Sequence, residues 1–194
     1  MKVLVIGASG TLGSAVATAL EKEHQVVRAS RSGPVTVDLE DSDSLDALFA
    51  GLPDLDAVVC CAVSGPMVDF ATATDEEFLA GLQGKLLGQI ALARRAQHHL
   101  RDGGSITLTG GTFTTPMVGG SLGAVINTGL EGFVRNAAAE LPRDLRINLV
   151  SPGWIAETLQ LLGRDPAPGI LAVDAARSYV TAVEGRTNGE TLLP

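Results

Sequence analysis

The sequence predicts a single α/β domain whose doubly wound, mostly parallel, seven-stranded sheet is covered by helices on both faces. Short apolar runs alternate along the chain with stretches whose apolar residues follow helical spacing, as in strands joined by crossover helices. The 194 residues are 45% hydrophobic, which is enough for one sizeable core. No linker or internal repeat divides residues 1–194, so we expect one domain.

The predicted elements follow in strict alternation. The first strand, Val3 to Ile6, is too short for a buried helix and rich in β-branched residues, as a strand buried on both faces should be. Right-handed crossovers bring the carboxyl ends of all these strands to one edge, where the connecting loops line a single crevice. We expect strands at 3–6, 25–29, 34–37, 56–61, 105–109, 145–150 and 190–193, and helices at 14–22, 42–51, 75–100, 121–141 and 173–183.

Three glycines come directly after the first strand and lead into the first helix. One glycine allows the sharp turn, another lets backbone N–H groups approach a pyrophosphate, and a third lets the helix pack closely. The helix amino terminus then attracts the anion. The spacing G-x-x-G-x-x-G departs from the usual fingerprint, and a glycine turn that binds nothing is the alternative. The order favours a dinucleotide site formed by Gly7, Ser9, Gly10, Thr11, Leu12 and Gly13.

Composition excludes several other classes of function. The net charge of −8 argues against nucleic acid or an anionic membrane surface as a partner. A secretory signal peptide is rejected because Gly7 already ends the amino-terminal apolar run, and we therefore expect a cytoplasmic protein. Cys60 and Cys61 are adjacent on a strand and point to opposite faces, so neither a disulfide nor a metal site is expected there.

Five segments together resemble the short-chain dehydrogenase/reductase (SDR) family over essentially the whole chain. They are GASGTLG at 7–13, Asp38 after the third strand, DAVVCCA at 56–62, RINLVSPG at 146–153 and TNGETLL at 187–193. The resemblance implies a Rossmann-type fold, an NAD or NADP cofactor, and a homodimer or homotetramer built on helices 75–100 and 121–141. By position in the family motifs, it also implies cofactor contacts at Asp38, Leu39, Cys61, Ala62, Pro152, Gly153 and Ile155.

The end of the second strand bears on the choice between the two cofactors. A carboxylate there would bind the adenosine ribose of NAD, but this chain has no acid before Asp38. Arg28, Ser30, Arg31 and Ser32 stand there instead, and a guanidinium with hydroxyls suits the 2′-phosphate of NADP. Two solvated arginines in an exposed turn are the alternative. We expect NADP rather than NAD, bound through Ser30 and Arg31.

The catalytic residues of the family are missing. The family's tyrosine aligns with Gly123, its lysine with Asn127, and its serine with a position at or beside Gly110. The family's strand-four motif is replaced in this chain by Cys60-Cys61-Ala62-Val63. The only tyrosine, Tyr179, belongs to the last helix, where we expect it to pack. The chain therefore looks like an atypical subgroup without the Tyr-x-x-x-Lys pair.

Other polar residues are candidates for the chemistry in that crevice. Lys85 aligns with the family's active-site asparagine and is suited to donating a proton or holding an anionic group. Thr109 and Thr112 offer hydroxyls to a carbonyl, and Asn127 offers an amide to a ribose hydroxyl. The alternatives are a solvated helix lysine and threonines that only shape a turn.

Three functions remain open on the sequence. The first is an NADP(H)-dependent oxidoreductase of a small carbonyl, imine or activated alkene. The second is a catalytically silent NADP(H) sensor, and the third a non-redox isomerase or cyclase on the same scaffold. Losing a general acid costs about 10²–10⁴-fold in rate, and hydride transfer is the cofactor's own chemistry. We therefore favour the oxidoreductase.

Overall fold

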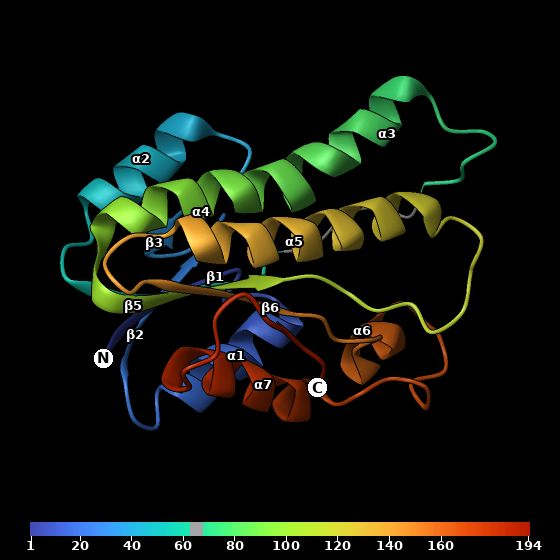
Figure 1. The fold of residues 1–194 in the computed structure, drawn as a ribbon. Coiled ribbons are helices and arrows are strands. Elements are labelled where there is room, and N and C mark those ends of the chain that lie inside the picture. The colour runs from blue at the N-terminus through green and yellow to red at the C-terminus, as the bar shows by residue number, and fades with distance from the viewer. Residues whose placement is uncertain (63–67) are drawn as a thin grey trace.

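The computed structural model describes residues 1–62 and 68–194. Its strands form one sheet in the order β3-β2-β1-β4-β5-β6-β7, and every neighbouring pair is parallel (Figure 1). The doubly wound fold is confirmed, and the sheet is wholly rather than mostly parallel. The strands are β1 Lys2–Ile6, β2 Gln25–Ser30, β3 Val35–Thr36, β4 Leu55–Cys60, β5 Leu100–Thr109, β6 Arg146–Val150 and β7 Thr191–Leu192.

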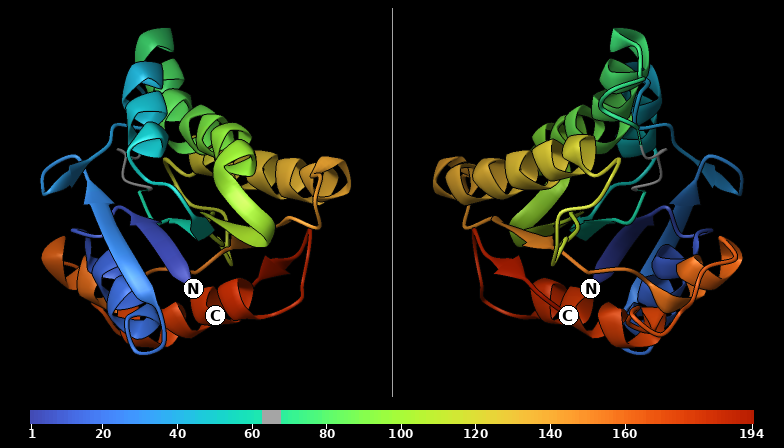
Figure 2. Two further views of the ribbon diagram at one scale, coloured as in Figure 1. Left: turned by 90° about the vertical axis from the view of Figure 1, so that its left-hand side faces the viewer. Right: turned by 90° about the vertical axis from the view of Figure 1, so that its right-hand side faces the viewer.

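Helices cover both faces of the sheet, as Figure 2 shows end-on. One face carries α1 (Thr11–Leu20) and α7 (Ala172–Glu184), which pack against each other. The opposite face carries α2 (Ser42–Ala50), the continuous run α3 (Asp75–Leu82), η1 (Gln83–Leu87) and α4 (Gly88–His99), and α5 (Ser121–Glu140). A short helix, α6 (Ala156–Leu161), follows β6. None of the helices in the described part of the chain is both long and apolar enough to cross a membrane.

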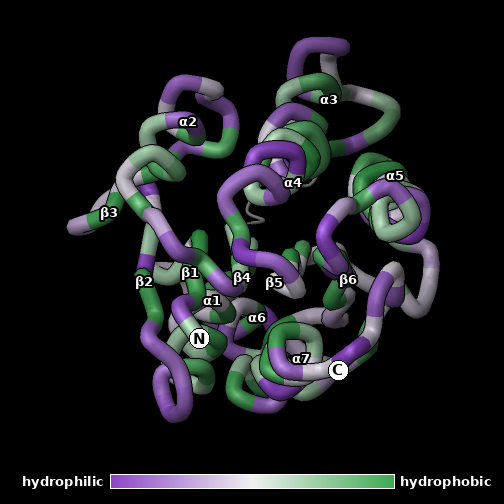
Figure 3. The backbone as a smooth tube through the Cα atoms, turned by 60° about the vertical axis from the view of Figure 1, so that its left-hand side comes forward, coloured by the Kyte–Doolittle hydropathy of each residue, from purple (hydrophilic) through white to green (hydrophobic). Residues whose placement is uncertain are grey.

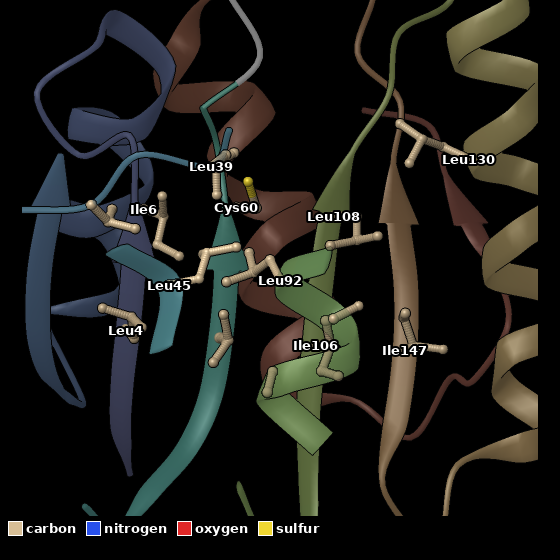
Figure 4. Packing of buried hydrophobic residues seen from close by; sticks show 14 of the residues in the cluster. Leu4, Ile6, Leu39, Leu45, Cys60, Leu92, Ile106, Leu108, Leu130 and Ile147 are labelled. Carbon is tan, nitrogen blue, oxygen red and sulfur yellow. The ribbon is translucent and has the colours of Figure 1, made fainter. Parts of the chain in front are cut away.

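Successive residues of each strand pack into two separate hydrophobic cores, one on each face of the sheet. Leu4 and Ile6 of β1 pack with α2 and α4, whereas Val3 and Val5 pack with α1 and α7. Figure 4 shows the first of these cores, where Leu92 of α4 lies over the sheet. The helices alternate between polar and apolar stretches (Figure 3). Strand β1 is apolar from Val3 to Ile6, whereas β5 carries the polar residues Arg101 and Asp102 near its start. Burial on both faces explains why the first strand shows no alternation in sequence.

Two elements differ from the sequence-based expectation in ways that affect the site. Helix α1 begins at Thr11 rather than Ser14, directly after the glycine turn. The expected long helix from Asp75 starts with a capping box formed by Thr74 and Glu77. It is then interrupted at Gln83–Leu87 by a π turn, the segment η1. Helical periodicity alone does not reveal such a turn, because the apolar spacing continues through it.

Candidate cofactor cleft and active site

Two of the three glycines after β1 are required by the fold itself. Gly7 has φ +81°, and a Cβ there would lie 2.7 Å from the backbone nitrogen of Ala62. A Cβ on Gly13 would lie 2.1 Å from the carbonyl oxygen of Gly7. Both positions are therefore closed to any side chain, because strand ends and helix α1 approach one another too closely.

Gly10 differs from both of these glycines. Its backbone is extended, with φ −81° and ψ 166°, and a Cβ there would meet only the Gly7 carbonyl oxygen at 3.4 Å. Packing within the protein does not demand glycine here, and Gly10 faces a cleft. Gly10 is the N-cap of helix α1, which has no side-chain cap and no acidic residue in its first turn. The first-turn amides of Thr11, Leu12 and Gly13 are thus available to an anion.

The cleft at this place has a volume of about 290 Å³. Its walls come from the ends of β1, β2, β3 and β4, with Gly84 of η1 closing one side. Such a crevice at the carboxyl ends of parallel strands is where doubly wound sheets bind nucleotides. Of the expected cofactor residues, the cleft brings together Gly7, Ser9, Gly10, Ser30, Arg31, Asp38, Leu39, Cys61 and Ala62.

The two arginines near the end of β2 behave differently. Arg28 donates hydrogen bonds to the Glu21 carboxylate at 2.7 and 2.8 Å and to the Thr18 hydroxyl at 3.0 Å. Arg31 is exposed, lines the cleft and makes no ion pair or hydrogen bond with any residue that the structure describes. The sequence-based grouping of both arginines was therefore wrong for Arg28, because α1 places Glu21 within reach of it.

Asp38 combines a structural contact with a position in the cleft wall. Its carboxylate accepts a hydrogen bond from the Glu40 amide at 3.0 Å, and its own amide donates to the Ser44 hydroxyl at 2.9 Å. These bonds fix the turn after β3, where Asp38 is exposed and lines the cleft.

The expected contacts after β6 lie outside the cleft's lining. Pro152 accepts a hydrogen bond from the Thr112 amide at 2.9 Å, and Ile155 bridges Ile170. A Cβ on Gly153 would meet nothing within 4 Å. These residues share the carboxyl edge of the sheet with the cleft. Val63, part of the altered strand-four motif, lies outside the described residues.

The expectation that Thr109 faces the crevice is wrong. It is buried at the end of β5, where its hydroxyl donates to the Cys60 carbonyl at 2.5 Å and hydrogen-bonds the Tyr179 hydroxyl at 2.8 Å. Leu108 belongs to the core under α4 and α5, so strand alternation turns Thr109 towards α7. Tyr179 is fully buried, as expected of a packing residue, and burial raises the pKa of its phenol.

The two cysteines face opposite cores, as the strand period predicts. Cys60 packs under α2 and α4, and Cys61 packs with α1 and α7. Both are free thiols. Burial raises the pKa of Cys60 to about 12 and that of Cys61 well above its usual value, so both side chains behave as small apolar residues.

The remaining catalytic candidates lie around the start of α5. The Thr112 hydroxyl donates to the Ser151 carbonyl at 3.0 Å, which anchors the loop after β5. The Asn127 amide nitrogen lies 3.2 Å from where a Cβ on Gly111 would be. Lys85, on η1, is half-buried, and burial lowers the pKa of its ammonium group. Its ammonium has no hydrogen bond or ion pair within residues 1–62 and 68–194.

One residue near this site could not be identified from the sequence. The Phe113 ring lies 2.9 Å from the place where a Cβ on Gly123 would be. The helix position that carries the family's tyrosine is thus covered by an aromatic ring from the preceding loop. Only the folded loop reveals this contact, since Phe113 belongs to no motif.

The comparisons with known proteins agree with this geometry. A family model described as Enoyl-(Acyl carrier protein) reductase matches residues 2–183. The crystal structure of the protein lin1944 from Listeria innocua is 37% identical, with all of this chain and 98% of that chain covered and a TM-score of 0.93. A small-chain dehydrogenase is 25% identical over all of this chain and 95% of its own, with a TM-score of 0.86.

A third structure, of a small-chain dehydrogenase in complex with NADPH, is 23% identical. The superposition covers all of this chain and 96% of that chain, with a TM-score of 0.86. At that identity the likeness concerns the fold alone. No match was found among curated protein sequences.

Proposed function

The chain belongs to the short-chain dehydrogenase/reductase family, and from this premise we propose that it is an NADP(H)-dependent oxidoreductase of a small carbonyl or imine-type substrate. The main observation behind this proposal is the open space beside Gly10: packing within the protein does not require a glycine there, and the residue lines the cleft. A pyrophosphate there would lie against the uncapped amino end of α1. When bound, the nicotinamide supplies the hydride.

Arg31 supports NADP over NAD. Its guanidinium lines the cleft beside Ser30 and Ser32 and has no carboxylate partner in the described residues. An unpaired arginine beside hydroxyls would bind a 2′-phosphate in a two-pronged, charge-assisted manner. The fold that carries NADPH in the third solved structure is the fold of this chain, which is compatible with the same ligand.

The protein's own groups then have to place the substrate and deliver a proton. Lys85 is the candidate proton donor or anion-holding group, because its ammonium is half-buried without a counter-ion in the described part of the chain. Asn127 would hydrogen-bond a ribose hydroxyl, and Thr112 would shape the loop beside it. With its hydroxyl committed, Thr109 has no part in this proposal.

The proposal includes a homodimer or homotetramer in the cytoplasm. The run α3–η1–α4 and the neighbouring α5 expose Leu79, Leu87 and Val125, which are 62%, 47% and 51% exposed. Apolar side chains on the outer faces of two adjacent helices favour contact with a second copy. Two free, buried thiols are compatible with a reducing compartment.

A catalytically silent NADP(H) sensor is the second candidate. Phe113 covers the helix position at which the family's tyrosine would act, and this observation favours it. The two candidates differ in one readout, since a sensor binds NADPH but does not oxidise it with any acceptor.

Calorimetric titration tests the cofactor proposal. We expect NADPH to bind more tightly than NADH, and Arg31→Ala to weaken NADPH about 10- to 100-fold while leaving NADH unchanged. Arg28→Ala is the matched control, because Arg28 is held by Glu21 and Thr18 away from the cleft. Equal affinities of the wild type for the two nucleotides would refute NADP preference. Following NADPH absorbance with carbonyl and imine acceptors then separates oxidoreductase from sensor.

A further inference from the structure

Gln89 is a fully buried polar side chain one helical turn after Lys85. Its amide nitrogen donates to the Lys85 carbonyl oxygen at 2.8 Å and to the Thr109 carbonyl oxygen at 2.9 Å. Its amide oxygen accepts from the Thr109 backbone nitrogen at 2.9 Å. Two of these hydrogen bonds tie the helix run to Thr109, the last residue of β5, and the third stays within the helix run.

The helix is irregular at this point. Within η1 the Gly88 amide bonds the Gln83 carbonyl, five residues back, so the turn is wider than in an α-helix. Single π turns of this kind are uncommon and occur often at functional sites. The Gln89 side chain bonds the Lys85 carbonyl inside this widened turn, where it reinforces the irregular backbone.

The widened turn also packs against the wall of the cofactor cleft. A Cβ on Gly84 would lie 2.6 Å from the Glu40 carboxylate, and a Cβ on Gly88 would lie 2.9 Å from the Leu39 Cβ. Leu39, Glu40 and Gly84 all line the cleft. Lys85 therefore sits on a segment fixed between the cleft wall and the end of β5.

We propose that Gln89 is a positioning residue: it locks the π turn to β5 and thereby holds the Lys85 ammonium in its half-buried place. The catalytic consequence rests on the proposed role of Lys85. The competing explanation is that Gln89 only fills the core between α4 and β5, in which case an apolar side chain of similar volume would serve as well.

The test is Gln89→Met, which keeps the volume and removes the three hydrogen bonds. We expect the turn to relax and Lys85 to become solvated. The pH dependence of Lys85 acetylation by acetic anhydride, read by peptide mass mapping, should then move upward toward that of exposed Lys22 in the same digest. Gln97→Met is the matched control, because Gln97 lies on the same helix and, within the described ranges 1–62 and 68–194, its side chain bonds only the Arg94 carbonyl.

Turnover gives the second readout. We expect Gln89→Met to lower kcat about 10- to 100-fold with NADPH affinity unchanged. In the Lys85→Met background it should add no further loss. If Gln89→Met does not fold, Gln89→Asn carries the test, since its shorter amide cannot span from the helix to both Thr109 groups.

The outcomes separate this inference from the proposed function. An unchanged acetylation profile of Lys85 in folded Gln89→Met, or an equal additional loss in the Lys85→Met background, would overturn the positioning role. A shifted Lys85 profile in a protein that shows no turnover would support the positioning role and refute the oxidoreductase.

Discussion

The half of the sheet's carboxyl edge that follows β1 and the half that follows β5 differ in the space beside particular glycines. At Gly10, after β1, the space beside the backbone is open and faces the cleft. At Gly110, Gly111 and Gly123, after β5 and on α5, the corresponding space is filled by Ser151, Asn127 and Phe113. The first half keeps open space at Gly10, whereas Ser151 and Phe113 occupy the Cβ positions of Gly110 and Gly123, with which the family's serine and tyrosine were aligned. The proposed function accordingly uses the first half for the cofactor and takes its proton donor from another residue, Lys85.

The largest expected effect concerns proton delivery by Lys85, on η1. Lys85→Met should lower kcat about 10²–10⁴-fold while leaving the Kd for NADPH unchanged. Because burial lowers the pKa of Lys85, wild-type turnover should fall as pH rises through a value below the usual lysine range. Lys85→Arg, which keeps its charge at all these pH values, should lose that alkaline limb. A pH–rate profile checks this, and full turnover by Lys85→Met would remove Lys85 from the site.

The next effect separates the two kinds of glycine in the first half. Gly13→Ala should lower the free energy of unfolding by about 2–4 kcal/mol, because its Cβ would overlap the Gly7 carbonyl. Gly10→Ala should cost less than about 1 kcal/mol and weaken NADPH about 10-fold, since its methyl group enters the cleft. Denaturant titration and calorimetry measure both. Unaltered NADPH affinity in Gly10→Ala would contradict the assignment of that space to a ligand.

Introducing the family's tyrosine and lysine into α5 tests whether the second half has room for them. Gly123→Tyr with Asn127→Lys restores the family pair but drives a Cβ into the Phe113 ring, which should destabilise the protein by about 1–3 kcal/mol. Adding Phe113→Ala should recover most of that loss. Thermal denaturation of the double and triple variants checks this, and equal stability of the double variant and the wild type would show that Phe113 leaves room.

The smallest effect is expected for Tyr179, which is buried on α7. Tyr179→Phe removes the hydrogen bond to Thr109 but leaves the bond from Thr109 to the Cys60 carbonyl. We expect a loss of about 1 kcal/mol in the free energy of unfolding, with no change in NADPH affinity. A clear drop in NADPH affinity would mean that Tyr179 acts on the cleft through Thr109.

The sequence predicted the fold well because each local pattern agrees with the global one. The run Val3 to Ile6, the glycine turn and the capping box at Thr74 are local signals that tertiary packing leaves in place. The site was predicted less completely. Leu108 is a residue of the core under α4 and α5, so strand alternation alone already predicts that Thr109 points to the opposite face of the sheet. The prediction of Thr109 as a crevice residue left this alternation out.

Other parts of the site depend on contacts that are distant in the sequence. Arg28 is held by Glu21, which only the packing of α1 on β2 brings near. The π turn at Lys85 is joined to the end of β5 by the buried Gln89 amide, a contact between segments twenty residues apart. Phe113 reaches Gly123 through a loop that no periodic pattern describes.

The proposed function depends on a nucleotide diphosphate binding at the amino end of α1. A titration of isotopically labelled protein with NADPH, followed through the backbone amide resonances, measures this binding. We expect the amides of Gly10, Thr11 and Leu12 to shift together with that of Arg31 and to saturate at one common ligand concentration. Amides at the end of β1 and the start of α1 that stay unmoved while other resonances saturate would contradict it.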